Sequence, residues 1–357
     1  MAIGERMVLA ETEKKKTGWK QSLKKWAWLA FVGLLCMIGV SCLAGATYEV
    51  IHERRDARRF PMKGQLVDVG GYRMNLDCTG HGSIPVILEN GMGIPGEGWR
   101  QVQREIEKFA RVCSYDRAGY GWSDPGPLPR TSEQIAKELH SLLQNAGISP
   151  PYILVGASYG AFTLRVFNGL YPDEVAGMVL VAPELEDQHA ILAAHHFITP
   201  ADDKKQARLD STLAALYPAL RRLGVARLAI TSQRSGLPEP FESEIYALSL
   251  RPNHIPAMLN EDLSDQQSAE QVRESGNLGN IPLIVLTPAP EGRSPEVSQQ
   301  DWDIYIAETA ALQHKIAQLS TQGQQITVGT MHELQFEKPD AVVAAVRQII
   351  QSASAGR

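Results

Sequence analysis

A serine flanked by glycines, between an apolar run and a helical stretch, constrains this chain more than any other feature of its sequence. Residues 156–160 read Gly-Ala-Ser-Tyr-Gly, with the serine at position 158. They follow the apolar run Tyr152–Val155 and precede a helical stretch that starts near Ala161. Because glycine has no Cβ, a strand and a helix can approach each other closely there. This context predicts a sharp strand–turn–helix corner that exposes the Ser158 hydroxyl above a sheet.

Short apolar runs alternate with helical stretches from Gly64 onward. The first two runs flank Gly70 and Gly71, which is typical of a hairpin. The runs that we expect to form strands are Gln65–Val69, Tyr72–Cys78, Pro85–Glu89, Val112–Tyr115, Tyr152–Val155, Gly177–Val181, Ile281–Leu286 and Gln325–Val328. Strands separated by helices predict an α/β fold, with a mainly parallel sheet covered on both faces.

The alternation stops between residues 185 and 280, where helix formers and prolines are frequent and no strand pattern occurs. Structureless loops of that length are uncommon, so we expect a helical cap over the sheet. The core would then comprise residues 64–184 and 281–353. Within it, Thr131–Ala146 has helical periodicity, with Thr131 or Ser132 as the N-cap and Gly147 at its end. Pro339–Ser352 is expected to form the last helix.

The N-terminal segment has the pattern of a membrane anchor. A basic head, residues 1–25, leads into the uncharged run 26–48, and residues 49–63 form an expected linker. A bilayer core requires about 20 apolar residues, and the apolar part of a signal peptide is usually only about 7–15. A retained single-pass helix is therefore favoured over cleavage at the small residues 44–46. The lysine-rich head predicts a cytoplasmic N-terminus and an extracytoplasmic core.

Composition and motifs exclude several other classes of function. The net charge is −5 and no basic stripe occurs outside the N-terminus, so nucleic acid is not an expected partner. The glycines at 119 and 121 lack the strand–helix setting of a dinucleotide site. Histidines 189, 195, 196 and 254 lie in the cap without the spacing of metal ligands. We expect neither a cofactor nor a metal.

His332 is the expected general base. A serine hydroxyl is a weak nucleophile until a base takes its proton, and in this architecture the chain order is serine, acid, histidine. His332 comes just after the last expected strand and just before the C-terminal helix. From there an imidazole can reach back to Ser158.

Four motifs resemble the α/β-hydrolase superfamily, and most of all its serine hydrolases with a helical cap. They are Val-Ile-Leu-Glu-Asn-Gly-Met-Gly at 86–93, Tyr-Asp-Arg-Ala-Gly-Tyr-Gly-Trp-Ser-Asp at 115–124, Leu-Val-Gly-Ala-Ser-Tyr-Gly at 154–160, and Met-His-Glu-Leu-Gln-Phe-Glu-Lys-Pro at 331–339. The resemblance covers roughly Gly64 to Ile350 and fades in the cap. It implies the α/β-hydrolase fold, an eight-stranded sheet whose second strand is antiparallel.

The resemblance also implies the roles of several residues. Ser158 would be the nucleophile and His332 the base, while the backbone N–H groups of Met92 and Tyr159 would form the oxyanion hole. Asp116 and Arg117 are interpreted as structural groups that hold the loop after the fourth strand.

The acid of the triad is the open point. Relatives place an aspartate directly after the sixth strand, where this chain has Ala182. Glu184, two residues later, is our first choice. Glu291, after the seventh strand, is the second, and an absent acid is the third alternative.

The resemblance implies hydrolysis of a carboxylic ester through an acyl-serine intermediate. The apolar cap and the membrane anchor suggest a lipophilic or amphipathic substrate. Peptidase and acyltransferase activities use the same groups and stay open. Epoxide hydrolases and haloalkane dehalogenases use aspartate at the position of Ser158 and are disfavoured. A membrane-bound binding or scaffold protein is the alternative from another class, because Ala182 replaces the usual acid.

Cys78 and Cys113 lie in the expected core. The residues alone favour two unpaired buried thiols, with a disulfide open if the compartment is oxidising. The resemblance implies that the end of the Cys78 strand lies near the start of the Cys113 strand. A disulfide and two free thiols are then equally compatible with the sequence.

Overall fold

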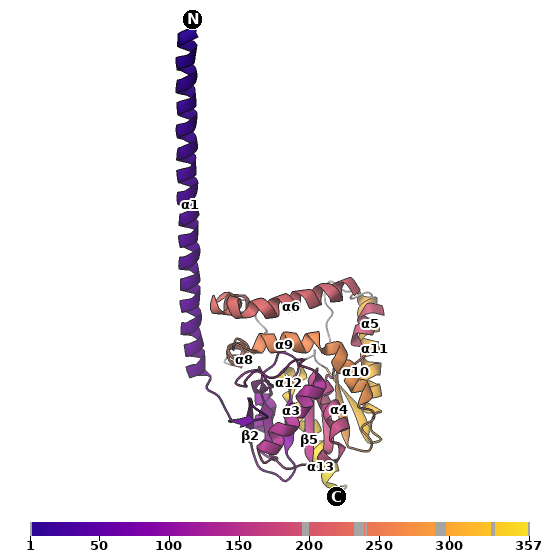
Figure 1. The fold of residues 1–357 in the computed structure, drawn as a ribbon. Coiled ribbons are helices and arrows are strands. Elements are labelled where there is room, and N and C mark those ends of the chain that lie inside the picture. The colour runs from indigo at the N-terminus through magenta and orange to yellow at the C-terminus, as the bar shows by residue number, and fades with distance from the viewer. Residues whose placement is uncertain are drawn as a thin grey trace.

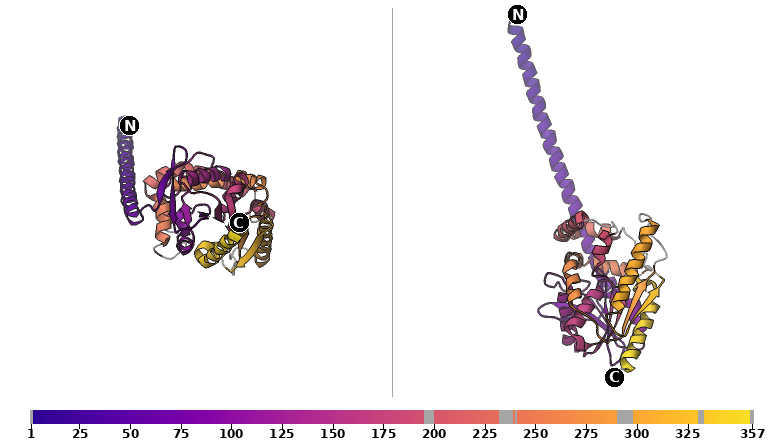
Figure 2. Two further views of the ribbon diagram at one scale, coloured as in Figure 1. Left: turned by 90° about the horizontal axis from the view of Figure 1, so that it is seen from below. Right: turned by 90° about the vertical axis from the view of Figure 1, so that its right-hand side faces the viewer.

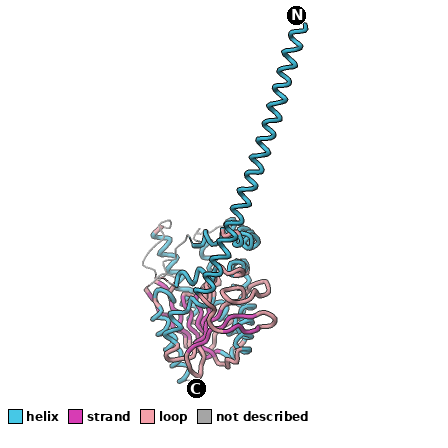
Figure 3. The backbone as a smooth tube through the Cα atoms, turned by 90° about the vertical axis from the view of Figure 1, so that its left-hand side faces the viewer, coloured by secondary structure: helices cyan, strands magenta, loops and turns pink. Residues whose placement is uncertain are grey.

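The computed structural model describes residues 2–194, 200–231, 239, 241–289, 298–329 and 333–355. A twisted sheet lies between two layers of helices, and one long helix extends away from this globular part (Figures 1 and 3). The strands are β1 (Gln65–Asp68), β2 (Arg73–Thr79), β3 (Val86–Glu89), β4 (Val112–Tyr115), β5 (Tyr152–Ala157), β6 (Val175–Val181), β7 (Leu283–Pro288) and β8 (Gly323–Val328).

The eight strands form one sheet in the order β1-β2-β4-β3-β5-β6-β7-β8. The pairs β1–β2 and β2–β4 are antiparallel and all the others are parallel. The mainly parallel sheet with an antiparallel second strand is therefore confirmed. The motif-bearing strand β5 lies in the middle of the sheet and is buried along its whole length.

Helices cover both faces of the sheet. The helical elements outside the cap are α1 (Ala2–Arg59), η1 (Gly96–Trp99), α2 (Arg100–Ile106), α3 (Ser132–Asn145), α4 (Gly160–Leu170), η2 (Pro172–Glu174), α11 (Gln299–Ala317), α12 (Leu334–Glu337) and α13 (Pro339–Ala355). One apolar core joins α3, α4 and α11 to the sheet, and a second core on the other face joins α2 and α13.

The start of α3 illustrates how local sequence sets an element. The Thr131 side chain accepts a hydrogen bond from the Gln134 N–H at 3.3 Å, so Thr131 is the N-cap. Ile135, Leu139 and Leu142 then share the buried face of the helix. Gly147, with φ of 66°, follows the helix end.

The described residues between β6 and β7 form six helices, in the region expected to form the cap. They are α5 (Gln188–Ala194), α6 (Pro200–Arg222), α7 (Val225–Thr231), α8 (Phe241–Ser249), α9 (His254–Leu263) and α10 (Asp265–Glu274). Helix α9 lies over the sheet, and α6 crosses above α9 on the side toward the N-terminus (Figure 1).

Helix α1 is continuous from Ala2 to Arg59, so the helix extends through most of the segment 49–63 expected as a linker. Within the described side chains, Lys24–Arg59 is long and apolar enough to span a membrane by length and composition. The two views of Figure 2 show it projecting from one corner of the globular part.

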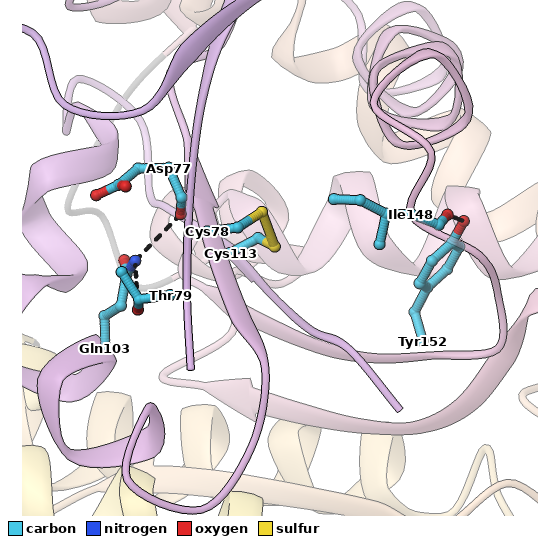
Figure 4. Close-up of a disulfide and its surroundings, with 7 residues drawn as sticks. All are labelled: Asp77, Cys78, Thr79, Gln103, Cys113, Ile148 and Tyr152. Carbon is cyan, nitrogen blue, oxygen red and sulfur yellow. Dashed lines mark hydrogen bonds between the residues drawn. A yellow bond between two sulfur atoms is a disulfide. The ribbon is translucent and has the colours of Figure 1, made fainter. Parts of the chain in front are cut away.

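Cys78 and Cys113 form a disulfide between β2 and β4 (Figure 4), which is one of the two states that the sequence and the resemblance together left open. The two residues are direct partners in the antiparallel register. Beside them, the Gln103 side chain donates to the Asp77 carbonyl and the Thr79 hydroxyl at 3.1 and 3.3 Å. The bridge ties the antiparallel edge of the sheet to its parallel part.

Replacing both bridged cysteines by alanine is expected to lower the free energy of unfolding by about 2–4 kcal/mol, because the open chain gains conformational freedom when unfolded. Urea denaturation of the full chain in detergent measures this. Cys36→Ser with Cys42→Ser, both exposed in α1, is the control and should leave the stability unchanged. A wild-type chain whose stability is insensitive to reductant would contradict the prediction.

Candidate active site

Ser158 occupies the corner between β5 and α4, as the sequence predicts. Its φ is 48°, a left-handed value that is rare outside glycine and costs about 1–3 kcal/mol. The Ser158 N–H donates to the Val181 carbonyl at 3.0 Å, which ties the corner to the end of β6. Its side chain is partly exposed, while the residues on either side are buried. The backbone therefore presents the hydroxyl at the carboxyl edge of the sheet.

The two glycines of the motif allow this close approach. A Cβ at Gly160 would lie 2.7 Å from the Asn90 carbonyl oxygen, and one at Gly156 would lie 2.8 Å from Leu164 Cδ1. Larger residues would push α4 away from the loop after β3 and displace Ser158.

The loop Asn90–Gly93 lies directly beside Ser158. A Cβ at Gly91 would lie 3.3 Å from Ser158 Cβ and 3.9 Å from its Oγ. Within the part of the chain that the structure describes, the N–H groups of Met92 and Tyr159 have no hydrogen-bond acceptor. Two unused donors, one in the loop beside the serine and one directly after it in the chain, are suited to stabilising an oxyanion.

The Arg117 side chain stabilises the loop Asn90–Gly93 through hydrogen bonds to its backbone. Its guanidinium donates to the carbonyls of Asn90 at 2.7 Å and Gly91 at 3.0 Å. The same group bonds Glu89 Oε1 at 2.6 Å and both carboxylate oxygens of Glu261 at 2.9 and 2.8 Å. All three charged side chains are at most 2% exposed. Burial raises the pKa of Glu89 to about 7, although Arg117 opposes the shift.

From the sequence, Arg117 is expected only to hold the loop after the fourth strand. Its side chain also joins the loop after β3 to the cap helix α9. Asp116 does act on the loops around its own strand. Its carboxylate accepts hydrogen bonds from the N–H groups of Gly96 and Trp122 at 2.8 and 2.9 Å. Sequence reasoning missed Glu261 altogether, since nothing in a run of helix formers marks one carboxylate as a core partner.

Two further side chains hold the same loop. The Gly93 N–H donates to the Tyr120 hydroxyl at 2.9 Å, and His254 Nε2 lies 3.0 Å from the Gly93 carbonyl. The Gly121 N–H lies 3.3 Å from His254 Nδ1. Burial lowers the pKa of His254 to about 4, so the imidazole is neutral and can accept on one nitrogen and donate on the other. His254 is therefore a structural residue of the loop.

Glu184 lies close to the nucleophile through its backbone, since its N–H donates to the Ser158 carbonyl at 3.2 Å. Burial, with a smaller contribution from the nearby Asp265 and Asp262 of the cap, raises the pKa of its carboxyl to about 8. Glu184 thus faces other carboxyl groups among the described residues. As a triad acid it would need a cationic partner to favour its ionised form.

His332 and Glu291 lie outside the described residues, so their expected roles stay predictions. Strand β8 ends at Val328 and runs parallel to β7 and β6, so the chain leaves it at the edge where β5 delivers Ser158. Among the described side chains, no group of three His, Cys, Asp or Glu residues could hold a metal ion.

The raised pKa of Glu184 predicts how stability depends on pH. Between about 4.5 and 8 the folded chain keeps a proton that the unfolded chain releases, so this group lowers stability as pH rises through that range. Glu184→Gln cannot ionise and should exceed the wild type in stability at pH 8, by on the order of 4 kcal/mol, and match it near pH 4. Denaturation at both pH values measures this. The exposed Glu105→Gln is the control, and an equal gain in both variants would contradict the prediction.

Comparison with known proteins gives the family. The model of the alpha/beta hydrolase fold family matches residues 84–267, which is more than half of the chain. The chain therefore belongs to the α/β-hydrolase family.

Two of the relatives with similar sequences are named only as uncharacterized proteins. The uncharacterized protein YqjL of Bacillus subtilis is 33% identical over 147 residues, which are 40% of this chain and 56% of YqjL. An uncharacterized vacuolar membrane protein of Saccharomyces cerevisiae is 31% identical over 158 residues, which are 43% of this chain and 24% of that protein. The matches thus span about half of the first relative and a quarter of the second.

Solved structures show the same fold at low sequence identity. A thermophilic esterase from Thermogutta terrifontis has a TM-score of 0.59 at 20% identity, over 81% of this chain and 98% of its own. The epoxide hydrolase VrEH1 from Vigna radiata has a TM-score of 0.61 at 16% identity, over 81% and 98%. At such identities the likeness concerns the fold alone.

Proposed function

We propose that this protein is a membrane-anchored serine hydrolase that cleaves a carboxylic ester. Ser158 would attack the ester carbonyl, and His332 would take its proton and return it to the leaving alcohol. Water would then hydrolyse the acyl-serine, with His332 again as the base. Glu184 is the proposed acid that orients His332, with Glu291 as the alternative. The Met92 and Tyr159 N–H groups would stabilise the oxyanion in both steps.

The single observation that supports this proposal best is the backbone of Ser158. A left-handed non-glycine residue stores strain that surrounding structure must hold, and such residues cluster at functional sites. The Tyr159 N–H directly after this serine and the Met92 N–H in the neighbouring loop have no acceptor among the described residues, which supports their proposed role as oxyanion donors. A carboxylate nucleophile, as in epoxide hydrolases, is absent from this position.

The N-terminal helix and the disulfide support the proposed location. Lys24–Arg59 has the length and apolarity of a membrane span. Disulfides persist mainly in oxidising compartments, and Cys78–Cys113 lies in the globular part. Both agree with a single-pass protein whose catalytic part lies outside the cytoplasm.

Labelling with a fluorophosphonate probe tests the proposal on the full chain in detergent micelles. Wild-type protein should be labelled, and Ser158→Ala and His332→Ala should not. Of Glu184→Ala and Glu291→Ala, the variant that loses most of its labelling rate identifies the acid. Folded wild-type protein that takes no label would refute the hydrolase, and a binding protein on this fold would replace it.

Turnover of esters, matched amides and alcohol acceptors distinguishes an esterase from a peptidase and an acyltransferase, which would use the same residues. Ester turnover with no cleavage of matched amides supports an esterase, whereas amide cleavage supports a peptidase. Transfer to an added alcohol in preference to water supports an acyltransferase.

A further inference from the structure

The backbone of helix α1 is in direct contact with the backbone of the turn between α6 and α7, at Leu223 and Gly224. A Cβ at Gly45 would overlap the Leu223 carbonyl oxygen, and one at Gly224 would lie 2.9 Å from the Gly45 carbonyl oxygen. Gly45 lies three residues before the end of the uncharged run 26–48. The cap therefore contacts α1 at the level where an apolar span would leave the hydrocarbon layer.

Ion pairs made by two buried arginines of the cap fix it in this position. Arg227 bonds Glu49 at 2.8 Å and Asp56 at 2.6 Å, and Arg221 bonds Glu53 at 2.7 Å. The three acids are spaced four and three residues apart, so they share one face of α1. Because both arginines and Glu49 are largely buried, these pairs orient α6 and α7 relative to α1.

The outer surface of α6 and α7 carries a row of exposed apolar side chains. We call it the leucine face, comprising Leu209, Leu213, Leu216, Leu223, Val225 and Leu228, which are 37–60% exposed. The first three are spaced by four and three residues, and therefore form one stripe along α6. Elsewhere in the described globular part, large apolar side chains of comparable exposure occur singly, such as Leu128 and Leu170. A clustered apolar face of this kind marks an interaction surface.

Among the side chains that the structure describes on α6, the exposed charged groups near this stripe are all basic. The exposed charges described on α6 are Lys204, Lys205, Arg208 and Arg222. The acid on this part of the helix, Asp210, is buried and accepts hydrogen bonds from Gln206. Leucines beside lysines and arginines are typical of helices that lie in the plane of a membrane interface.

The position of α6 agrees with such a location. The helix lies crosswise to α1 at the end of the globular part that faces the N-terminus of α1 (Figures 1 and 2). The run 26–48 would span about 34 Å at 1.5 Å per residue, which matches a hydrocarbon core of about 30 Å. A membrane around that run would lie directly above α6.

We propose that the leucine face docks into the interfacial layer of the bilayer that α1 spans, with the basic side chains of α6 on anionic lipid headgroups. The proposal rests on the membrane anchor and the hydrolase proposed above, and it deepens them. Beneath α6, helix α9 contacts the oxyanion loop through Met258, which lies against Gly93, and through the Glu261–Arg117 pair. The cap thus connects the membrane surface to the catalytic serine, and the substrate is an amphipathic ester taken from the adjacent leaflet.

Depth-dependent quenching tests the docking on the full chain in phosphatidylcholine–phosphatidylglycerol vesicles. A bimane fluorophore is attached at Leu213→Cys, in a chain with Cys36→Ser and Cys42→Ser, and lipids brominated in their chains act as quenchers. The control is Leu170→Cys, 40% exposed like Leu213 at 38%, but at the far end of α4 from Ser158. We expect at least about threefold stronger quenching at position 213, since a docked leucine lies near the acyl chains. Equal quenching at both positions would overturn the docking.

Activity tests the substrate route separately. The double variant Leu213→Asp with Leu216→Asp removes apolar contact from exposed positions outside the catalytic machinery. It should lower turnover of a long-chain ester held in vesicles by about tenfold or more, because each leucine loses its burial in the membrane. Turnover of a short soluble ester and fluorophosphonate labelling should be unchanged.

The outcomes separate this inference from the proposed function. Equal turnover of the vesicle-held ester by the variant and the wild type would overturn the leaflet route. Wild-type protein that takes no fluorophosphonate label would refute the hydrolase and the leaflet substrate together. Bromolipid quenching would still decide the docking in that case.

Discussion

Ser158→Ala is expected to lower ester turnover by about 10³–10⁶-fold, because the residual rate then comes from binding and the oxyanion donors alone. The variant should fold, since alanine is smaller and the side chain is partly exposed. Steady-state hydrolysis of a soluble ester by full-length protein in micelles measures the loss. The matched control is Ser141→Ala, a partly exposed serine on α3, which should keep the wild-type rate. Retained turnover in Ser158→Ala would place the chemistry elsewhere.

Ser158→Gly should separate activity from stability. Glycine adopts a φ of 48° without the cost that any other residue pays there. We therefore expect the inactive variant to be more stable than the wild type by about 1 kcal/mol, offset in part by the greater freedom of glycine in the unfolded chain. Such opposite effects at one position are typical of strained active sites. A clear loss of stability would mean that the backbone at Ser158 is not strained.

Arg117→Met is the second large effect, and it should lower the free energy of unfolding by about 3–5 kcal/mol. The substitution keeps most of the side-chain volume but leaves Glu89 and Glu261 buried without their cation. Chemical denaturation measures the loss. The control is Arg73→Met, whose ion pair with Asp124 is largely exposed and should contribute less than about 1 kcal/mol. Similar losses in the two variants would contradict the buried-network interpretation.

Activity gives a second view of Arg117. Arg117→Lys keeps the charge but cannot bond two carbonyls and two carboxylates at once. The loop Asn90–Gly93 should then be less well held, and the Met92 N–H less well oriented. We expect kcat to fall while KM changes little, because the oxyanion contact strengthens in the transition state. A change confined to KM would assign Arg117 to substrate binding instead.

Local patterns in the sequence determined much of this protein. Alternating apolar runs predicted all eight strands, and glycines around Ser158 predicted the corner between β5 and α4. Thr131 and Gly147 predicted the limits of α3. These features depend on residues close together in the chain, whose steric and hydrogen-bonding preferences act before any tertiary contact forms.

Only the tertiary structure decided the contacts between distant segments. Arg117 meets Glu261, 144 residues later, and Arg227 meets Glu49, 178 residues earlier. The Cys78–Cys113 bridge depends on strand register in the same way. Helical periodicity assigns a carboxylate such as Glu261 to one face of its helix. It does not show which distant segment packs against that face, so the sequence alone suggests a carboxylate exposed to solvent. The same reason hid the leucine face of α6, whose exposure beside α1 follows from where the folded chain places two segments far apart in the sequence.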